Sequence, residues 1–362
     1  MKHGRSRNAG LVLLAACALA AACKGKKSAE VNPIEPKISF NRTRVPLGSP
    51  LEITYTWVLE PAARKLPQDY RALVHFLDSH DMMLFEDDHN PQPPPSQWEP
   101  GKTYTYTRTK FVPLYPYVGE LNVRMGLYPH PGRGERPALK GQDAGLREYP
   151  VAKIELLPKT ENIFLFYKDG WHSPEPHPDN PAIERTWTKK EALVSFKNPK
   201  KDAVVYLEAD TSPKFFPDPP VLTVAVGTKV GIVVPIEGSD VFLKKIRVKA
   251  EDLGTDEWVD LRLMMNQSFV PKLLTPPLNN DERELGLLKY QLYVGEADKI
   301  GPLSGKEVVD ATPLPAEVVK ALAAASAKAP AKVPNAKAPA AAKAPAAAKA
   351  PPAAKAPPAK KS

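Results

Sequence analysis

The sequence predicts an all-β body of two antiparallel β-sandwiches, followed by a disordered C-terminal tail rich in Ala, Lys and Pro. Short runs alternate apolar with polar residues, which is the period of a strand with one buried face. Clusters of Pro, Gly, Asn and Asp separate these runs at near-regular spacing, as in immunoglobulin-like sandwiches. Of the 42 prolines, 8 lie in residues 329–362 and 34 in the rest of the chain, so long helices are disfavoured.

The alternating runs form two sets, with a predicted boundary near residues 159–161. Residues 23–36 are a predicted linker, and about 290 residues of body are enough for two domains. Residues 37–158 are predicted to form the first sandwich, with strands at Leu51–Val58, Ala72–Leu77, Tyr104–Phe111 and Leu121–Tyr128. Residues 159–312 are predicted to form the second, with strands at Ala192–Phe196, Ala203–Leu207, Val221–Val226, Lys229–Pro235, Lys244–Ala250, Trp258–Met265 and Leu287–Val294.

Residues 1–22 resemble the signal peptide of a bacterial lipoprotein precursor. A basic segment precedes the apolar run Ala9–Ala22, which is too short to span a bilayer and ends at Cys23. Lipoprotein signal peptides end in a Leu-Ala-Ala-Cys type box whose cysteine is lipidated, and Leu14–Cys17 matches this box as well. We favour Cys23 because it leaves a longer apolar run, and Cys17 is the alternative. An ordinary cleaved signal or a core helix is the competing interpretation.

The lipoprotein resemblance implies a place in the cell envelope. In such proteins an Asp after the lipidated cysteine favours the inner membrane, whereas here Lys24 follows Cys23 and Ala18 follows Cys17. The resemblance therefore implies a palmitate-bearing outer-membrane lipoprotein of a Gram-negative bacterium, facing the periplasm or the cell surface. Both cysteines of the chain lie in this leader, so we expect the body to fold without a disulfide, a zinc–thiolate site or a cysteine nucleophile.

The net charge of +9 at pH 7 is unevenly distributed. Residues 1–27 contribute +6 and residues 316–362 contribute +8, which leaves −5 for the body between them. A basic body would indicate nucleic-acid binding. This body is mildly acidic and the expected location is exported, so no nucleic-acid partner is expected.

The predicted final segment, residues 313–362, holds a short helix and then a repetitive tail. Pro315–Lys328 has a proline at its start and strong helix formers after it. Lys-Ala-Pro then recurs every six residues from Lys337 to Lys355, so the tail is expected to be extended and disordered. Two interpretations stay open: a solvated spacer, or a polycationic arm that holds anionic envelope polymer such as peptidoglycan, or lipid headgroups.

Short motifs follow one another along both halves of the body. Those of the first half are His75–Asp78, Asp87–His89, Ser96–Gly101 and Arg124–Tyr128. Over residues 37–130 they resemble β-sandwich accessory modules of bacterial membrane glycosyltransferases of the mannosyltransferase-like class. The second half is similar to another module of those proteins, at Gly170-Trp171, Glu175, Arg185–Thr188, Asn266–Pro271 and Asp281–Gly286. Because the sequence has no polytopic membrane part, the resemblance implies a sandwich module near glycan chemistry and not a transferase.

Tryptophan and arginine side chains are the candidate glycan-binding groups. An indole ring offers a flat face to a sugar, and a planar guanidinium donates hydrogen bonds to hydroxyls or carboxylates. The candidates are Trp98, Trp171, Arg185, Trp187 and Arg283. The competing interpretation for each tryptophan is packing inside a sandwich. Trp57 and Trp258 lie within strand patterns and are expected in the core.

The densest group of potential metal ligands comprises His75, His80 and His89 with Asp78, Asp81, Asp87 and Asp88. A hairpin between Leu77 and Met83 would bring two strand ends together, so a calcium or transition-metal site is conceivable. The simpler interpretation is a polar turn in which Asp and Ser side chains bond their own backbone. We therefore expect no metal and no other cofactor.

No catalytic pattern is recognisable in the sequence. G-x-S-x-G, H-E-x-x-H and a Gly-rich phosphate loop after a strand are all missing. The sequence thus predicts a non-enzymatic, lipid-anchored envelope protein that binds glycan or polysaccharide through loops at the sandwich ends. The alternative is an interaction scaffold in an envelope machine for secretion, motility or polysaccharide export. Exposed tryptophans would favour glycan binding, and a broad apolar patch or an unpaired sheet edge would favour the scaffold.

Replacing Cys23 by Ala is expected to abolish lipidation, because the thioether to diacylglycerol needs that sulfur. Each buried acyl methylene adds about 0.8 kcal/mol of membrane affinity, so the variant should also leave the membrane fraction. Metabolic labelling with a palmitate analogue measures the modification. Labelling that persists in Cys23→Ala and disappears in Cys17→Ala would assign the anchor to the other cysteine.

Overall fold

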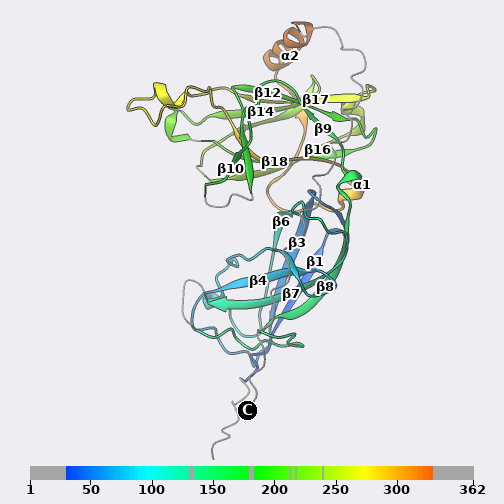
Figure 1. The fold of residues 1–362 in the computed structure, drawn as a ribbon, viewed down its shortest axis with the longest axis vertical. Coiled ribbons are helices and arrows are strands. Elements are labelled where there is room, and N and C mark those ends of the chain that lie inside the picture. Colours follow the sequence, from blue (N-terminus) through cyan, green and yellow to red (C-terminus); the bar gives the residue numbers. More distant parts are fainter. Residues whose placement is uncertain are drawn as a thin grey trace, which may run out of the picture. The chain divides into compact units, whose positions relative to one another are not determined.

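The computed structural model describes residues 30–129, 134–178, 183–211, 213–216, 218–238 and 240–328. The predicted signal peptide with Cys17 and Cys23, and the predicted Lys-Ala-Pro tail, lie outside the described residues. The body is mostly β-strand and forms several sheets, which confirms the all-β prediction (Figure 1). None of the helices in the described ranges is long and apolar enough to cross a membrane.

The predicted terminal helix is confirmed as α2 (Ala316–Lys328). The chain up to Pro315 forms one compact unit, and α2 belongs to a second. Both sandwiches lie in the first unit. Each of the predicted runs coincides with a strand, but several edge strands and the interior strands β8 (Tyr149–Leu157) and β11 (Glu184–Trp187) were not predicted.

The first sandwich consists of a three-stranded and a five-stranded sheet. The strand order of the smaller sheet is β1–β3–β6, formed by Ile34–Phe40, Pro50–Leu59 and Thr103–Phe111. The order of the larger sheet is β2–β8–β7–β4–β5, in which β2 is Arg44–Pro46, β7 is Gly119–Pro129, β4 is Tyr70–Leu77 and β5 is Met83–Glu86. The predicted linker ends too late, because the buried Ile34 already pairs with Leu59.

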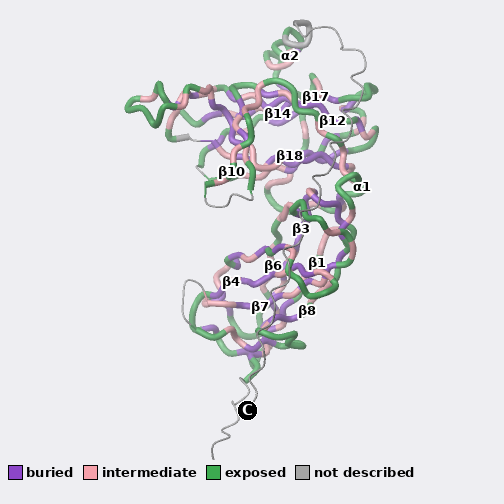
Figure 2. The backbone as a smooth tube through the Cα atoms, in the orientation of Figure 1, coloured by how far each residue is buried: buried purple, intermediate pink, exposed green. Residues whose placement is uncertain are grey.

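Alternate residues of neighbouring strands build the core of the first sandwich. Tyr55 and Trp57 point inward from β3, Val123 and Met125 point inward from β7, and all four are fully buried. Thr54, the sequence neighbour of Tyr55, is partly exposed. Burying one large apolar side chain contributes about 1.5–3 kcal/mol, so this alternation holds the two sheets together. Figure 2 shows the buried segments running along the strands.

The second sandwich consists of two six-stranded sheets. One has the order β10–β11–β18–β13–β16–β19, formed by Glu175–Pro176, Glu184–Trp187, Leu288–Glu296, Ala203–Asp210, Phe242–Val248 and Val308–Asp310. The other has the order β20–β15–β14–β17–β12–β9, formed by Thr312–Pro313, Val230–Pro235, Val221–Val226, Trp258–Met265, Glu191–Lys197 and Leu165–Tyr167. A short helix, α1 (Ala297–Ile300), follows β18. Val205 and Leu207 of the first sheet meet Leu261 and Leu263 of the second in a shared core.

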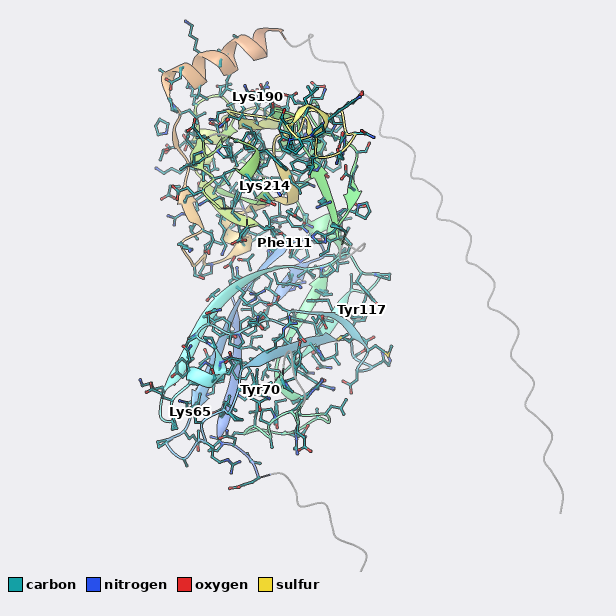
Figure 3. The ribbon with its side chains drawn as sticks, turned by 90° about the vertical axis from the view of Figure 1, so that its left-hand side faces the viewer. Lys65, Tyr70, Phe111, Tyr117, Lys190 and Lys214 are labelled. Carbon is teal, nitrogen blue, oxygen red and sulfur yellow. The ribbon has the colours of Figure 1, made fainter. Side chains whose placement is uncertain are left out.

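Residues of the first sandwich cover part of the outer face of the sheet that contains β13 and β16. Lys245 of β16 forms an ion pair with Glu52 of β3, with 2.6 Å between Nζ and Oε2, and both side chains are at most 4% exposed. Tyr206 of β13 packs edge-on against Phe111 of β6, with 6.1 Å between the ring centroids. Figure 3 labels Phe111 where the strands of the first sandwich approach the second.

Removing one partner of the buried ion pair is expected to destabilise the protein. In Lys245→Met the Glu52 carboxylate still accepts the 3.0 Å hydrogen bond from the Thr109 hydroxyl but loses its counter-charge. An uncompensated buried charge lowers the free energy of unfolding by about 3–5 kcal/mol. The double variant Glu52→Leu/Lys245→Met removes both charges and should recover most of the loss. Urea unfolding of the three proteins measures this difference. A single variant as stable as the wild type would show that the pair contributes little.

A chain of hydrogen-bonded polar side chains crosses the interior of the first sandwich. The Tyr55 hydroxyl and Arg108 Nε both donate to Asp87 Oδ2, at 2.8 and 3.0 Å. His89 Nδ1 lies 2.6 Å from the main-chain oxygen of Asp87, and its Nε2 lies 2.7 Å from the Tyr106 hydroxyl. Because a carbonyl can only accept, Nδ1 carries the proton and Nε2 accepts from Tyr106. Burial is the main cause that lowers the pKa of His89 to about 4.

Stability is expected to fall as the pH drops from about 6.5 towards 4, because His89 binds a proton in the unfolded chain but not in the folded one. The contribution of neutral His89 to the free energy of unfolding is fully present above its pKa in the unfolded chain, about 6.5. It is lost as the pH falls towards its pKa in the folded protein, about 4. The resulting loss in the free energy of unfolding is about 2 kcal/mol between pH 7 and pH 5. The control variant His89→Gln cannot titrate and should lose this part of the pH dependence. Urea unfolding at both pH values tests the expectation, and an unchanged dependence in the variant would contradict it.

Candidate functional site

Trp98 lies in the core of the first sandwich and not at a ligand-facing surface. It is fully buried, stacks on Tyr104 at 5.5 Å between ring centroids, and lies 5.3 Å from the Trp57 ring. Its Nε1 donates to the carbonyl oxygen of Pro93 at 2.9 Å. The prediction that Trp98 binds glycan is therefore wrong. Its turn-rich segment folds back over the sandwich, where the ring loses its contact with water.

Trp171 and Trp187 are both half-buried in the second sandwich. Trp171 donates from Nε1 to the carbonyl oxygen of Leu193 at 2.8 Å, and its ring meets Tyr167 edge-on at 4.9 Å. Trp187 packs edge-on against Phe269 at 5.9 Å. Each indole keeps some exposed surface, and each also packs against a neighbouring aromatic ring.

The structure places Arg185 and Arg283 near the same residue, Glu175, but only Arg283 is shown to contact its carboxylate. Glu175 of β10 pairs with Arg185 of β11, and its Oε1 lies 2.5 Å from Nη1 of Arg283. Arg283 also binds Asp281, and this hydrogen bond lowers the pKa of the Asp281 carboxyl. Carboxylates of the protein itself thus accept hydrogen bonds from Nε, Nη1 and Nη2 of Arg283. Nε of Arg185 is buried and has no hydrogen-bond partner among the described residues.

A group of exposed aromatic rings lies instead on the outer face of the sheet that ends in β9. Phe164 is 61% exposed, Phe166 53% and Trp258 42%. Phe164 and Trp258 meet edge-on, with 6.2 Å between the ring centroids. We call these three residues the aromatic face. The expectation that Trp258 lies in the core is wrong.

The strand register explains how β9 and β17 contribute to one face. Both strands flank β12, in which Ser195 pairs with Phe166 on one side and with Asp260 on the other. Lys197 of β12 pairs with Trp258 in the same way. Side chains of directly paired residues lie on the same side of a sheet. The aromatic rings therefore share their surface with polar side chains of β12 and β17.

A row of polar groups lies beside the aromatic face. The Ser195 hydroxyl donates to Asp260 Oδ1, and Lys168 Nζ lies 3.1 Å from the same oxygen. The side chain of Asp260 is 40% exposed and that of Lys168 is 35% exposed. We call Ser195, Asp260 and Lys168 the polar row; Ser195 is buried, so Asp260 and Lys168 are its accessible members. A ligand that has both apolar faces and hydroxyl groups matches this combination.

The sequence contains a signal for Trp258 that the prediction did not use. Val259, Leu261, Leu263 and Met265 alternate and are all buried, so Trp258 must lie on the opposite face of β17. No such signal marks β9. Residues 163–167 are all apolar or aromatic, so alternation does not tell which of them face the core.

The turn after β4 confirms the polar-turn interpretation of Asp78 and His80. Asp78 Oδ1 accepts hydrogen bonds from the backbone N–H groups of His80 at 2.8 Å and Met82 at 2.9 Å. The His80 side chain is exposed. An aspartate that bonds the backbone two residues further on stabilises such a turn without a metal.

No family model matches the sequence, and no curated protein matches it. Among solved structures, the chain is similar to the N-terminal CBM22-1-CBM22-2 tandem domain of Xyn10C from Paenibacillus barcinonensis, with 9% identity, a TM-score of 0.23, and coverage of 73% of this chain and 92% of that chain. It is also similar to the functional form of the mosquito-larvicidal Cry4Aa toxin from Bacillus thuringiensis, with 7% identity, a TM-score of 0.24 and coverage of 77% of this chain. The match spans 55% of the toxin chain. Neither likeness is close enough to carry a conclusion on function.

Proposed function

We propose that the protein binds glycan without catalysing a reaction, and that the aromatic face is its binding surface. The observation that carries this proposal is the position of three exposed aromatic rings directly beside the polar row. This surface replaces the loop residues at the sandwich ends that were predicted from the sequence.

Sugar rings combine apolar C–H faces with hydroxyl groups at their edges. An indole such as that of Trp258 removes the apolar face from water, at about 25 cal/mol per Å² of buried apolar area. The Asp260 carboxylate can accept hydrogen bonds from the hydroxyls, and a charged acceptor makes such bonds stronger. The outer face of a sheet is broad, so it suits a stretch of polysaccharide better than one enclosed sugar.

We further propose that a lipid at Cys23 holds this surface in the outer membrane of a Gram-negative cell. The expected immunoglobulin-like topology of both sandwiches is part of the same proposal. The tail would act either as a spacer that extends the reach of the chain or as an arm for anionic polymer. Neither role requires an enzyme activity of the body.

Trp258→Ala is expected to weaken glycan binding at least about tenfold, which corresponds to about 1.4 kcal/mol of binding free energy. Affinity electrophoresis in gels that contain a panel of soluble polysaccharides measures the effect. Val233, on β15 of the same sheet and 47% exposed, offers the matched control Val233→Ala. Both substitutions remove exposed apolar surface, so neither should change the unfolding midpoint much. Equal retardation of both variants and the wild type by every polysaccharide would contradict the proposal.

The interaction scaffold stays as the second candidate function, because β9 is the end strand of its sheet. Lys168 N–H and the Phe164 carbonyl both bond to β12, so the backbone groups of Leu165 and Tyr167 face away from the sheet. A partner strand could add to this edge. Tyr167→Pro removes an outward N–H. This variant should abolish binding of a partner strand but leave the affinity of the aromatic face for glycan unchanged.

A further inference from the structure

Three potential metal ligands come together on the outer face of the five-stranded sheet in the first sandwich. His75 of β4 pairs directly with Glu86 of β5, and Asp88 lies two residues further on, so period-two alternation places all three on one side. One ligand atom of each residue lies within 4.8 Å of the other two. Bonds of about 2.0–2.2 Å from nitrogen and oxygen to zinc would let one ion contact all three after a small adjustment.

A fourth residue orients the imidazole. His75 Nδ1 lies 3.3 Å from Oε1 of Glu148, and Nε2 lies 4.0 Å from Oδ1 of Asp88. The three side chains are only 10–16% exposed. A carboxylate on the far nitrogen is the usual partner of a metal-binding histidine, because it sets the tautomer and turns the other nitrogen towards the ion.

Two arginines beside the cluster bind other groups. Arg124 of β7 pairs with His75 in the strand register, but its guanidinium forms an ion pair with Asp81. Arg71 donates to the main-chain oxygen of Asp88 at 2.8 Å and not to its carboxylate. Both arginines make the local field less favourable for a cation, but neither forms an ion pair with Glu86 or Asp88 in the part of the chain that the structure describes.

The two carboxylates of the cluster, Glu86 and Asp88, lack a lysine or arginine partner among the described residues. Arg136 lies 3.4 Å from Oε1 of Glu148, on the far side of the ring. Within the ranges that the structure describes, no lysine or arginine forms an ion pair with the side chain of Glu86 or Asp88. Asp88 Oδ1 accepts a hydrogen bond from the Val74 N–H at 2.8 Å, but two carboxylates this close to each other still repel unless a positive charge lies between them.

We propose that His75, Glu86 and Asp88 bind a divalent transition-metal ion, with Glu148 as a positioning residue. One imidazole and two carboxylates are a ligand set that suits zinc. Three protein ligands leave a coordination position for water or a ligand atom. The proposal replaces the sequence-based expectation of no metal, and its ligands are not those of the turn at His80.

Zinc chloride titrated into the full-length, chelator-treated protein tests the proposal by calorimetry. We expect one ion per chain at this site. His75→Gln and Glu86→Gln should each weaken binding at least tenfold, and Glu148→Gln should weaken it by about 10- to 100-fold. The matched control is His80→Gln, which removes an exposed imidazole from the neighbouring turn and should leave binding unchanged.

Glu86 is exposed, so Glu86→Gln should fold normally and keeps the test decisive if a His75 variant unfolds. X-ray absorption at the zinc edge should show one imidazole among oxygen ligands in the wild type. Absence of saturable zinc binding would overturn the proposal. So would zinc binding that Glu86→Gln and Glu148→Gln leave unchanged, or that His80→Gln abolishes.

Discussion

The alternation of side chains along a strand is the constraint on which every surface of this protein depends. Each sheet gives one face to a core, and the residues between the core positions must face outward. In β17 this rule buries Leu261 and exposes Trp258. In β4 it buries Val74 and Phe76 and places His75 on the outer face, opposite Glu86. Core packing thus decides indirectly which groups a ligand can reach.

The two sandwiches use their outer faces differently. In the second sandwich, one sheet turns Tyr206 and Lys245 towards the first sandwich, and the other carries the aromatic face. In the first sandwich, the five-stranded sheet carries a polar surface around His75. An aromatic surface suits a neutral polymer, whereas converging carboxylates suit a cation. The two proposed sites rest on different sheets and different chemistry, so either can fail without the other.

Polar groups in the interior contribute specificity as well as stability. Asp87 is 5% exposed, yet it accepts hydrogen bonds from Tyr55 and Arg108. Buried polar groups are tolerated only where such partners exist. The Glu52–Lys245 pair has the same character at the contact between the sandwiches. These interactions need particular partners, so they favour one arrangement of the sheets over others with equal apolar burial.

The sequence by itself determined the all-β class, most of the long strands and α2, because alternation and helix-start signals are local. It also placed Arg185 and Arg283 in motifs that the structure joins through Glu175. Only the tertiary structure decided that Trp98 is inaccessible and which rings surround Trp258. Trp98 is buried because a turn-rich segment folds back over the core, and the ring environment of Trp258 depends on β9, a three-residue strand within the apolar and aromatic run of residues 163–167. Likewise, the pairing of β4 with β5 brings Glu86 to His75. Contacts between residues distant in sequence depend on strand register, and a local pattern does not specify which strands pair.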